Sequence, residues 1–214
     1  MECLPLRGCF DVIAVIDYGV GNLFSVEKAL AAVGADVRVT SDAEELRQAE
    51  KIVLPGVGAF GDCMRNLEGT GLIPVIKSEI EAGKPLLGIC VGLQILFQGS
   101  EESPEAKGLG ILKGLVRRIS APGLKVPHMG WNSLSVRGED GKKLLNGLDS
   151  HPYVYFVHSY HAVPEETKVI AAAAEYGETI TAAVIKENVW ATQFHPEKSG
   201  DVGLQILKNF VSVS

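Results

Sequence analysis

The sequence predicts a three-layer α/β fold with a central mixed, mostly parallel sheet. In the first half of the chain, short apolar runs of strand length alternate with segments of helical periodicity. Beyond residue 108, strand-like stretches follow one another between turns. No linker or internal repeat divides the chain, so we expect one domain over residues 11–214, preceded by an N-terminal extension at residues 1–10 without clear periodicity.

The first half of the chain is predicted to alternate strands with helices. Asp11 to Asp17 is apolar enough for a buried parallel strand, and the helix after it has apolar residues at helical spacing until Gly34 stops it. Asp42 followed by Glu45 resembles a capping box and predicts a second helix start. The other elements expected here are strands at Val37–Thr40 and Lys51–Leu54, a helix at Leu72–Ala82 and a strand that ends at Cys90.

The second half is predicted to be rich in strands. Six strand-like stretches are separated by turns: Gly114–Ile119, Lys125–Val136, Tyr153–Val163, Val169–Glu175, Thr181–Lys186 and Val189–Phe194. A last amphipathic helix places Val202, Ile206 and Phe210 on one face. We therefore expect a mixed sheet.

The composition argues against several classes of function. The 214 residues are 46% hydrophobic and 21% charged, as in ordinary globular domains, and no apolar run is long enough to cross a bilayer. A net charge of −6 without a basic stripe argues against nucleic acid. Four cysteines without CxxC spacing argue against a zinc site, and we expect neither metal nor cofactor. The cysteine usage and a start without the features of a secretory signal favour a cytoplasmic location.

The most informative segment is Gly88-Ile89-Cys90-Val91-Gly92. It follows an apolar strand and precedes a helix, which is the pattern of a nucleophile elbow: a sharp turn whose small neighbours permit a strained backbone and whose central side chain projects into a cleft. The nucleophile would be the thiolate of Cys90. A cysteine on its own is usually a small core residue, so this interpretation needs a base elsewhere in the chain.

The candidate base is His195, which follows the last predicted strand. In extended backbone, residues two apart point to the same side, so Glu197 would hold the imidazole in one tautomer while the other ring nitrogen faces Cys90. Pro196 favours extended geometry in the residue before it. A histidine near a carboxylate is often only a surface feature, but together with the elbow it predicts a Cys-His-Glu triad.

Two other glycine-rich turns are candidates for binding. Gly19-Val20-Gly21-Asn22 lacks the spacing of a dinucleotide fingerprint or a Walker loop, so we do not expect a nucleotide there. Pro55-Gly56-Val57-Gly58 ends a strand beside the elbow, where a backbone N–H would be placed to meet an oxyanion. A simple tight turn is the alternative.

These motifs resemble those of the class I, or triad-type, glutamine amidotransferases, a flavodoxin-like family, and more closely those of the glutaminase subunits of imidazole glycerol phosphate synthases. The resemblance extends from Val12 to Phe210, and the elbow with Gln94 and the segment Gln193–Glu197 mark the class. Four segments mark the subfamily: Ile16–Asn22, Pro55–Gly58, Met129–Asn132 and His195–Ser199. Related amidotransferases often have Gly-Gly in place of Gly56-Val57, which argues against anthranilate, carbamoyl phosphate and pyridoxal phosphate synthases.

The resemblance implies hydrolysis of glutamine through a thioester. His195 would accept the thiol proton, Cys90 would attack the side-chain amide carbon, and His195 would then protonate the departing ammonia. Glu197 would orient the imidazole and stabilise its charged form. Water activated by the same histidine would release glutamate.

The resemblance also assigns the groups around the substrate. The backbone N–H of Val91 and an N–H in the turn at Val57 and Gly58 would stabilise the oxyanion, after a peptide reorientation that the glycines beside Val57 favour. Substrate contacts are implied for Gly56, Gln94, His158, Ser159 and Tyr160. For Gln94, a solvent-facing side chain is the alternative.

A partner is expected as well, because the 214 residues include no domain that would accept ammonia. In the family, the partner is a separate (β/α)₈ cyclase in a heterodimer that makes imidazole glycerol phosphate and aminoimidazole carboxamide ribotide in histidine biosynthesis. The residues that match its docking face are Asn22, Trp131, Tyr155 and Lys198. Burial in the core is the alternative for the two aromatic residues.

Two other functions would use the same motifs. A stand-alone cysteine hydrolase or peptidase of the related flavodoxin-like superfamily would usually have its histidine soon after the nucleophile, whereas His195 lies late in the chain. A binding or regulatory subunit would have an incomplete triad, whereas all three residue types are present. Both alternatives are therefore weaker than the glutaminase.

Overall fold

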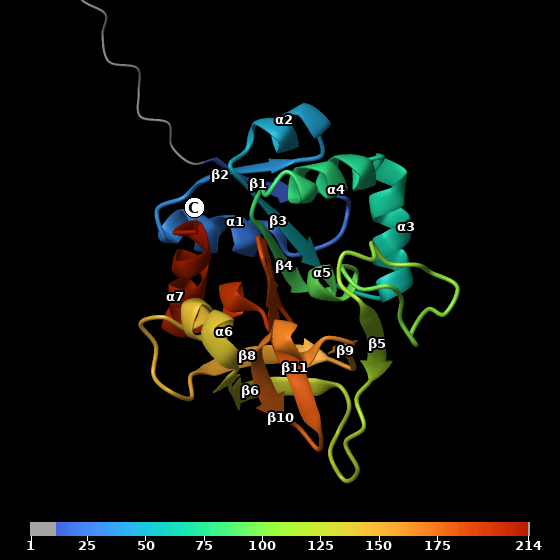
Figure 1. The fold of residues 1–214 in the computed structure, drawn as a ribbon, viewed down its shortest axis with the longest axis vertical. Coiled ribbons are helices and arrows are strands. Elements are labelled where there is room, and N and C mark those ends of the chain that lie inside the picture. Colours follow the sequence, from blue (N-terminus) through green and yellow to red (C-terminus); the bar gives the residue numbers. More distant parts are fainter. Residues whose placement is uncertain (1–11, 214) are drawn as a thin grey trace, which may run out of the picture.

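The computed structural model describes residues 12–213, so the predicted extension at residues 1–10 lies outside the described part of the chain. An eight-stranded sheet in the order β2-β1-β3-β4-β12-β11-β10-β7 forms the middle layer, with helices on both of its faces (Figure 1). This confirms the predicted three-layer α/β fold. The strands of this sheet are β1 (Val12–Ile16), β2 (Asp36–Thr40), β3 (Lys51–Gly56), β4 (Leu86–Cys90), β7 (Ser135–Val136), β10 (Ile170–Glu175), β11 (Thr179–Lys186) and β12 (Val189–Thr192).

The sheet is mixed. The first five strands of the order pair in parallel, and β11, β10 and β7 add to them antiparallel. Every residue of β3 and β4 is buried, because helices cover both faces of these central strands, and apart from Lys51 at the start of β3 their sequences are accordingly apolar. The edge strand β2 instead alternates exposed and half-buried residues up to Thr40, which is buried.

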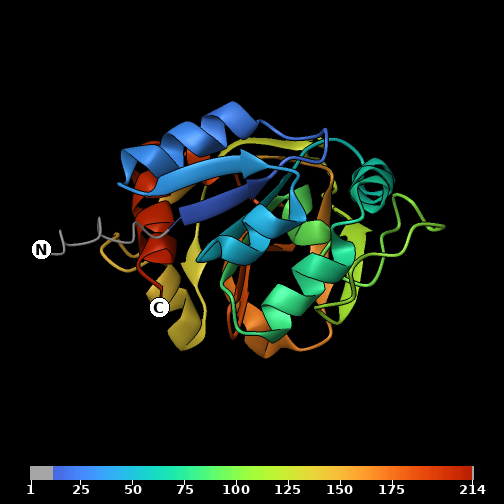
Figure 2. The same ribbon diagram turned by 90° about the horizontal axis from the view of Figure 1, so that it is seen from above.

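Helices form the two outer layers (Figure 2). On one face α7 contacts both α1 and α6, and on the other α4 contacts α2 and α3, while α3 also contacts α5. Two of these helices, α3 and α6, are absent from the sequence predictions. The helices are α1 (Leu23–Ala32), α2 (Ala43–Gln48), α3 (Phe60–Thr70), α4 (Ile73–Glu81), α5 (Val91–Gln94), α6 (Gly138–Leu144) and α7 (Gly200–Val211).

The predicted ends of the first two helices are largely correct. The residue after the cap of α1 is Gly34, in the left-handed region with φ +91°. The Asp42 side chain caps α2 by accepting hydrogen bonds from the N–H groups of Glu44 and Glu45. Only half of a capping box forms, because the Glu45 side chain binds Arg38 instead of returning to the backbone of Asp42.

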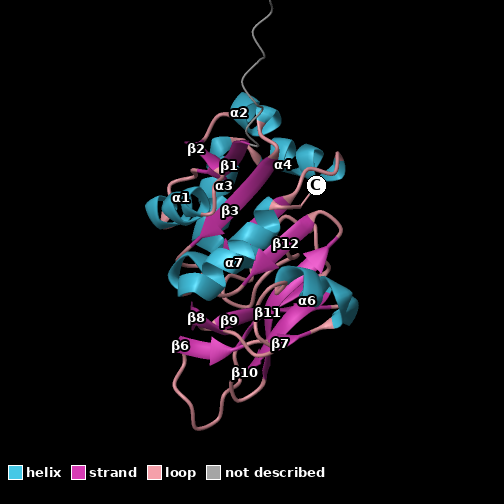
Figure 3. Cartoon of the chain, turned by 90° about the vertical axis from the view of Figure 1, so that its left-hand side faces the viewer, coloured by secondary structure: helices cyan, strands magenta, loops and turns pink. Residues whose placement is uncertain are grey.

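Two predicted strands are each divided in the structure (Figure 3). The stretch Lys125–Val136 contains β6 (His128–Ser133) and β7, which belong to different sheets. The stretch Tyr153–Val163 contains β8 (Tyr153–His158) and β9 (Tyr160–Pro164), so Ser159 lies at a break. β6 pairs with β8, and β9 pairs with β5 (Gly114–Arg118), in two small antiparallel sheets. The two 3₁₀ turns are η1 (Thr167–Val169) and η2 (Pro196–Lys198).

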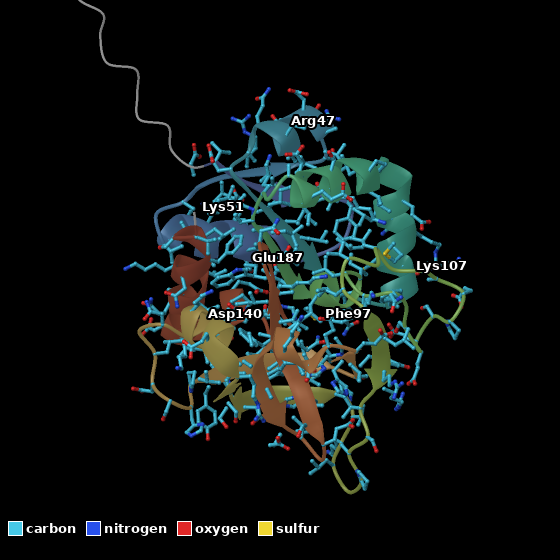
Figure 4. All side chains as sticks on the ribbon, in the orientation of Figure 1. Arg47, Lys51, Phe97, Lys107, Asp140 and Glu187 are labelled. Atoms are coloured by element: carbon cyan, nitrogen blue, oxygen red, sulfur yellow. The ribbon has the colours of Figure 1, made fainter. Side chains whose placement is uncertain are left out.

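Side chains fill the space between the layers (Figure 4). Phe97 is completely buried, whereas Arg47 and Lys107 lie exposed at the periphery. One continuous hydrophobic cluster joins the parallel and antiparallel parts of the sheet. It therefore holds the carboxyl ends of β3, β4 and β12 in a fixed relation, and these are the ends at which the predicted site residues lie. Within residues 12–213, no helix is long and apolar enough to cross a membrane.

Candidate active site

Cys90 occupies a strained turn between β4 and α5. Its backbone has φ +57° and ψ −110°, a region that non-glycine residues rarely adopt. Such a conformation costs on the order of 1–3 kcal/mol and persists only where the surrounding structure enforces it. The strain therefore falls on the predicted nucleophile, as the elbow pattern implies.

The neighbouring glycines serve close packing. A Cβ on Gly92 would lie 1.9 Å from the carbonyl oxygen of Leu54 in β3, and a Cβ on Gly88 would lie 2.9 Å from the carbonyl oxygen of Gly92. Neither glycine has a positive φ. Any larger residue at these positions would push α5 away from the sheet, so the glycines let the helix begin directly against β3.

The elbow opens into a cavity of about 310 Å³ at the carboxyl ends of the parallel strands. Most predicted site residues line this cavity: Val57, Gly58, Cys90, Val91, Gln94, His158, Ser159, Tyr160, His195 and Lys198. Glu102, Pro127 and Val157 also line it and were not anticipated from the sequence. Gly56 does not line it but packs behind the elbow, where a Cβ would lie 2.7 Å from the nitrogen of Gly92. Its contact with substrate stays a prediction.

His195 lies between Cys90 and Glu197. Its Nδ1 is 2.7 Å from Glu197 Oε1, both side chains are nearly inaccessible to solvent, and the ring also interacts electrostatically with Cys90. Burial by itself lowers the pKa of His195, but the hydrogen bonds and charges of Cys90 and Glu197 outweigh it and raise the pKa to about 9. Among residues 12–213, Glu197 Oε2 has no hydrogen-bond partner, so the described contact of this carboxylate is with His195.

The local backbone around this pair differs from the expectation. His195 is extended, as Pro196 requires, but Pro196–Lys198 forms the 3₁₀ turn η2 instead of an extended segment. The Ser199 hydroxyl supports the turn by donating to the carbonyl oxygen of His195 over 2.7 Å. Glu197 thus reaches the imidazole because the chain turns tightly, and the expected alternation of side chains along a strand was wrong.

We expect the variant Glu197→Gln to lower the pKa of His195, because the carboxylate stabilises the imidazolium. Titration of His195 by ¹H–¹⁵N NMR should give a midpoint near 9 in the unmodified protein and a lower one in the variant. The pKa of His195 lies above the value of about 6.5 of an unfolded histidine, so protonation of this ring stabilises the folded protein. This contribution to the free energy of unfolding is complete below about pH 6.5 and is lost as the pH rises through 9.

A control for this titration is Glu178→Gln, which removes a carboxylate 3.7 Å from a different histidine, His161. It should leave the midpoint of His195 unchanged. An equal midpoint in the unmodified protein and in Glu197→Gln would show that the carboxylate does not stabilise the imidazolium.

The turn beside the elbow is held by two side chains. The Tyr18 hydroxyl donates to the carbonyl oxygen of Pro55 over 2.5 Å, and Cys63 Sγ lies 3.4 Å from the carbonyl oxygen of Val57. Burial raises the pKa of the Cys63 thiol to about 11, so Cys63 acts as a weak donor. Across a trans peptide the carbonyl and the next N–H point in opposite directions, and the N–H of Gly58 therefore points away from Cys63. The oxyanion roles of Val57, Gly58 and Val91 stay predictions.

Gln94 faces inward. It is 3% exposed, and its Nε2 donates to the carbonyl oxygen of Tyr160 over 3.0 Å and to Gln193 Oε1 over 3.1 Å. The alternative of a solvent-facing side chain is excluded. Gln193 in turn directs its Nε2 at Cys90 Sγ over 3.8 Å, a contact that the sequence predictions do not include.

The predicted docking residues lie at the surface around the site. Trp131 is 57% exposed and Tyr155 half-buried, and their rings make an edge-on contact at 6.1 Å across β6 and β8, so burial of Trp131 in the core is excluded. Asn22 is exposed at the start of α1, and Lys198 is exposed on η2, which α1 contacts. Their role in docking stays a prediction. In the described part of the chain, no group of three or more His, Cys, Asp or Glu is placed to hold a metal ion.

Comparison with known proteins defines the class to which this site belongs. Residues 14–213 match the family "Glutamine amidotransferase class-I", and the chain belongs to that family. Solved structures share the fold: a glutamine amidotransferase has a TM-score of 0.73 at 22% identity, covering 94% of this chain and 99% of that one. The PurLQS structure from Thermotoga maritima has a TM-score of 0.71 at 23% identity, covering 93% and 96%.

Curated relatives narrow the class. "Imidazole glycerol phosphate synthase subunit HisH" of Syntrophotalea carbinolica is 53% identical over 207 residues, covering 93% of this chain and 98% of the relative. The proteins of the same name in Caldanaerobacter subterraneus subsp. tengcongensis and Aquifex aeolicus are each 52% identical, covering 93% and 92% of this chain and 97% and 94% of the relatives. Within the class, the chain is therefore a member of the HisH subunits of imidazole glycerol phosphate synthase.

Proposed function

We propose that this chain hydrolyses glutamine at Cys90 and supplies the ammonia to the cyclase reaction of imidazole glycerol phosphate synthase in histidine biosynthesis. The observation that carries the proposal is a thiol on a strained elbow that shares its cavity, and interacts, with a buried histidine whose Nδ1 lies 2.7 Å from a buried carboxylate. Nucleophile, base and orienting group are thus placed in the relation that acyl transfer requires.

The proton moves between Cys90 and His195 during the reaction. His195 takes the thiol proton, and the sulfur attacks the side-chain amide carbon of glutamine to give a tetrahedral intermediate. The imidazolium then protonates the nitrogen, the C–N bond breaks, and ammonia leaves a glutamyl thioester. Water attacks the thioester while His195 accepts its proton, which returns to the sulfur as glutamate departs. In the resting site the pKa of His195 is about 9, so the histidine holds the proton that it takes from the thiol at neutral pH.

The cavity supports the choice of substrate. Its volume of about 310 Å³ is at the small end of ligand pockets and suits a single amino acid. Gln94, His158, Ser159 and Tyr160 surround the space opposite the thiol and would hold the substrate. Charge on the amide oxygen would be met by backbone N–H groups of Val91 and of the turn at Val57 and Gly58.

The ribbon of β6 and β8 supports a docking site for the partner. Along one of its faces Met129, Trp131 and Tyr153 are each more than half exposed, whereas its other face is packed inward. The carbonyl oxygen of Tyr155 in this ribbon accepts a hydrogen bond from the N–H of His195 over 3.0 Å, so the face adjoins the site. We assign this face to a (β/α)₈ cyclase subunit in a cytoplasmic heterodimer.

The deciding experiment measures glutamate release with and without the cyclase subunit and its nucleotide ligand. The isolated chain should hydrolyse glutamine slowly, and the complex should be at least about tenfold faster, a coupling of ordinary size. Trp131→Ala should weaken this stimulation. Leu115→Ala, which trims an exposed apolar side chain on β5, should not. Fast hydrolysis without the partner, or peptidase activity instead, would contradict the proposal.

A further inference from the structure

A relay of hydrogen bonds, formed by Asn132, His128, His158 and the carbonyl of Tyr160, extends from β6 to the substrate pocket. Asn132 Nδ2 lies 3.4 Å from His128 Nε2, and His128 Nδ1 lies 3.1 Å from His158 Nε2. His158 Nδ1 lies 2.9 Å from the carbonyl oxygen of Tyr160. His128 itself is not among the residues that line the pocket, so the relay connects it to the site through His158.

The carbonyl oxygen of Tyr160 fixes which group donates and which accepts in every hydrogen bond of this relay. A carbonyl only accepts, so the proton of neutral His158 is on Nδ1 and its Nε2 is an acceptor. His128 must then donate from Nδ1, which leaves its Nε2 to accept from the amide of Asn132. The Asn132 side chain meets this requirement, because its Oδ1 accepts from the N–H of Ser133 over 2.8 Å and its Nδ2 also donates to the carbonyl oxygen of Glu175.

The same carbonyl fixes the orientation of the side-chain amides of Gln94 and Gln193, which lie beside Cys90. Gln94 must present its Nε2 to Tyr160, and its second N–H is taken by Gln193 Oε1. Gln94 Oε1 is therefore the atom left for a ligand, an acceptor suited to an N–H of glutamine. Gln193 is turned so that its Nε2 faces Cys90.

Burial holds both histidines neutral, and His128 is also part of an aromatic stack. Their rings are almost completely buried, and His128 is stacked between Phe156 and Tyr176, with ring centroids at 4.7 Å and 4.0 Å. Burial lowers the pKa of His128 to about 4 and that of His158 to about 3. The relay requires neutral rings, because a second proton on His158 would place its Nε2–H against the Nδ1–H of His128.

We propose that His128 is a positioning residue for the glutamine site. It donates a hydrogen bond from Nδ1 to His158 and so keeps the His158 proton on Nδ1, where it binds the carbonyl oxygen of Tyr160. That carbonyl in turn holds the side-chain amide of Gln94 in the orientation that presents Oε1 to the substrate. The inference rests on the proposed function, since it concerns how that substrate is bound. Without the donor, His158 can move its proton to Nε2, the carbonyl of Tyr160 loses a partner, and the Gln94 amide is free to rotate.

Two variants test this role in the complex with the cyclase: one keeps the aromatic ring and the other keeps the hydrogen-bond donor. His128→Phe keeps a ring between Phe156 and Tyr176 but removes the donor, and we expect KM for glutamine to rise about tenfold with kcat little changed, as for a lost hydrogen bond that acts on binding. His128→Asn loses the stack but retains an N–H near the position of Nδ1, and we expect KM within about threefold of the unmodified complex. The reverse pattern would show that His128 serves packing alone and would overturn the proposal.

The tautomers provide a readout that does not depend on catalysis. Long-range ¹H–¹⁵N NMR of the full chain at neutral pH should show His128 and His158 both neutral with the proton on Nδ1, and His158 should lose this preference in His128→Phe. An Nε2 proton on either ring of the unmodified protein would overturn the relay. If the unmodified complex fails to release glutamate, the proposed function fails while the tautomers still decide whether the relay exists.

Discussion

Replacing Cys90 with alanine is expected to lower glutamine-dependent synthesis by the complex by at least about 10⁴-fold, because among residues 12–213 no other thiol lines the cavity and could form the thioester. Cys63 cannot substitute: it is buried beneath the turn at Val57, and burial raises the pKa of its thiol to about 11. Under the proposed function the partner takes up ammonia from either source, so synthesis should continue when ammonium is added. Product formation with each nitrogen source is the measurement.

A matched variant separates chemistry from backbone strain. Cys90→Gly removes the same thiol but places glycine at φ +57°, which it adopts without cost, so it should be about 1–2 kcal/mol more stable than Cys90→Ala and equally inactive. Denaturant unfolding of both proteins tests this. If Cys90→Ala still used glutamine, a different nucleophile would have to be sought.

Local patterns were sufficient for the parallel strands of the central sheet and failed for two helices. The buried runs of β1, β3 and β4 are recognisable because both faces of these strands are covered. In α3 and α6 the helical signal is weakened by glycines that packing requires. A Cβ on Gly61 would lie 2.8 Å from Ser103 Oγ, and one on Gly141 would lie 2.1 Å from the carbonyl oxygen of Ala171. Neither neighbour can be inferred from the segment itself.

The site shows the same division between local and distant information. Cys90, His195 and Glu197 stand out because each lies in a short motif with a chemical reason for its spacing. The contact of Gln193 with Cys90 and that of His128 with His158 join residues far apart in sequence, because β12, which ends just before Gln193, pairs with β4, and β6 pairs with β8. The break at Ser159, which separates β8 from β9, has the same origin, because these strands belong to different sheets.

Replacing Gly92 with alanine should strongly damage both the stability and the activity of the protein. The added methyl would lie 1.9 Å from the carbonyl oxygen of Leu54, a backbone atom of a completely buried central strand that cannot give way. Overpacking a core usually costs 1–3 kcal/mol, and this contact is closer than a side chain could relieve, so we expect a loss of at least about 3 kcal/mol. Any folded fraction should be inactive, because α5 and the N–H of Val91 would be displaced from Cys90.

Gly69→Ala is the control for this effect, since it makes the same chemical change in a helix. Gly69 is exposed in α3, and a Cβ there would have no neighbour within 4 Å. This variant should gain about 0.5–1 kcal/mol from the better helix propensity of alanine and retain full activity. Denaturant unfolding of both variants compares the two directly. If Gly92→Ala were as stable and active as Gly69→Ala, the elbow would not depend on the close approach of α5 to β3, and the strain at Cys90 would need another cause.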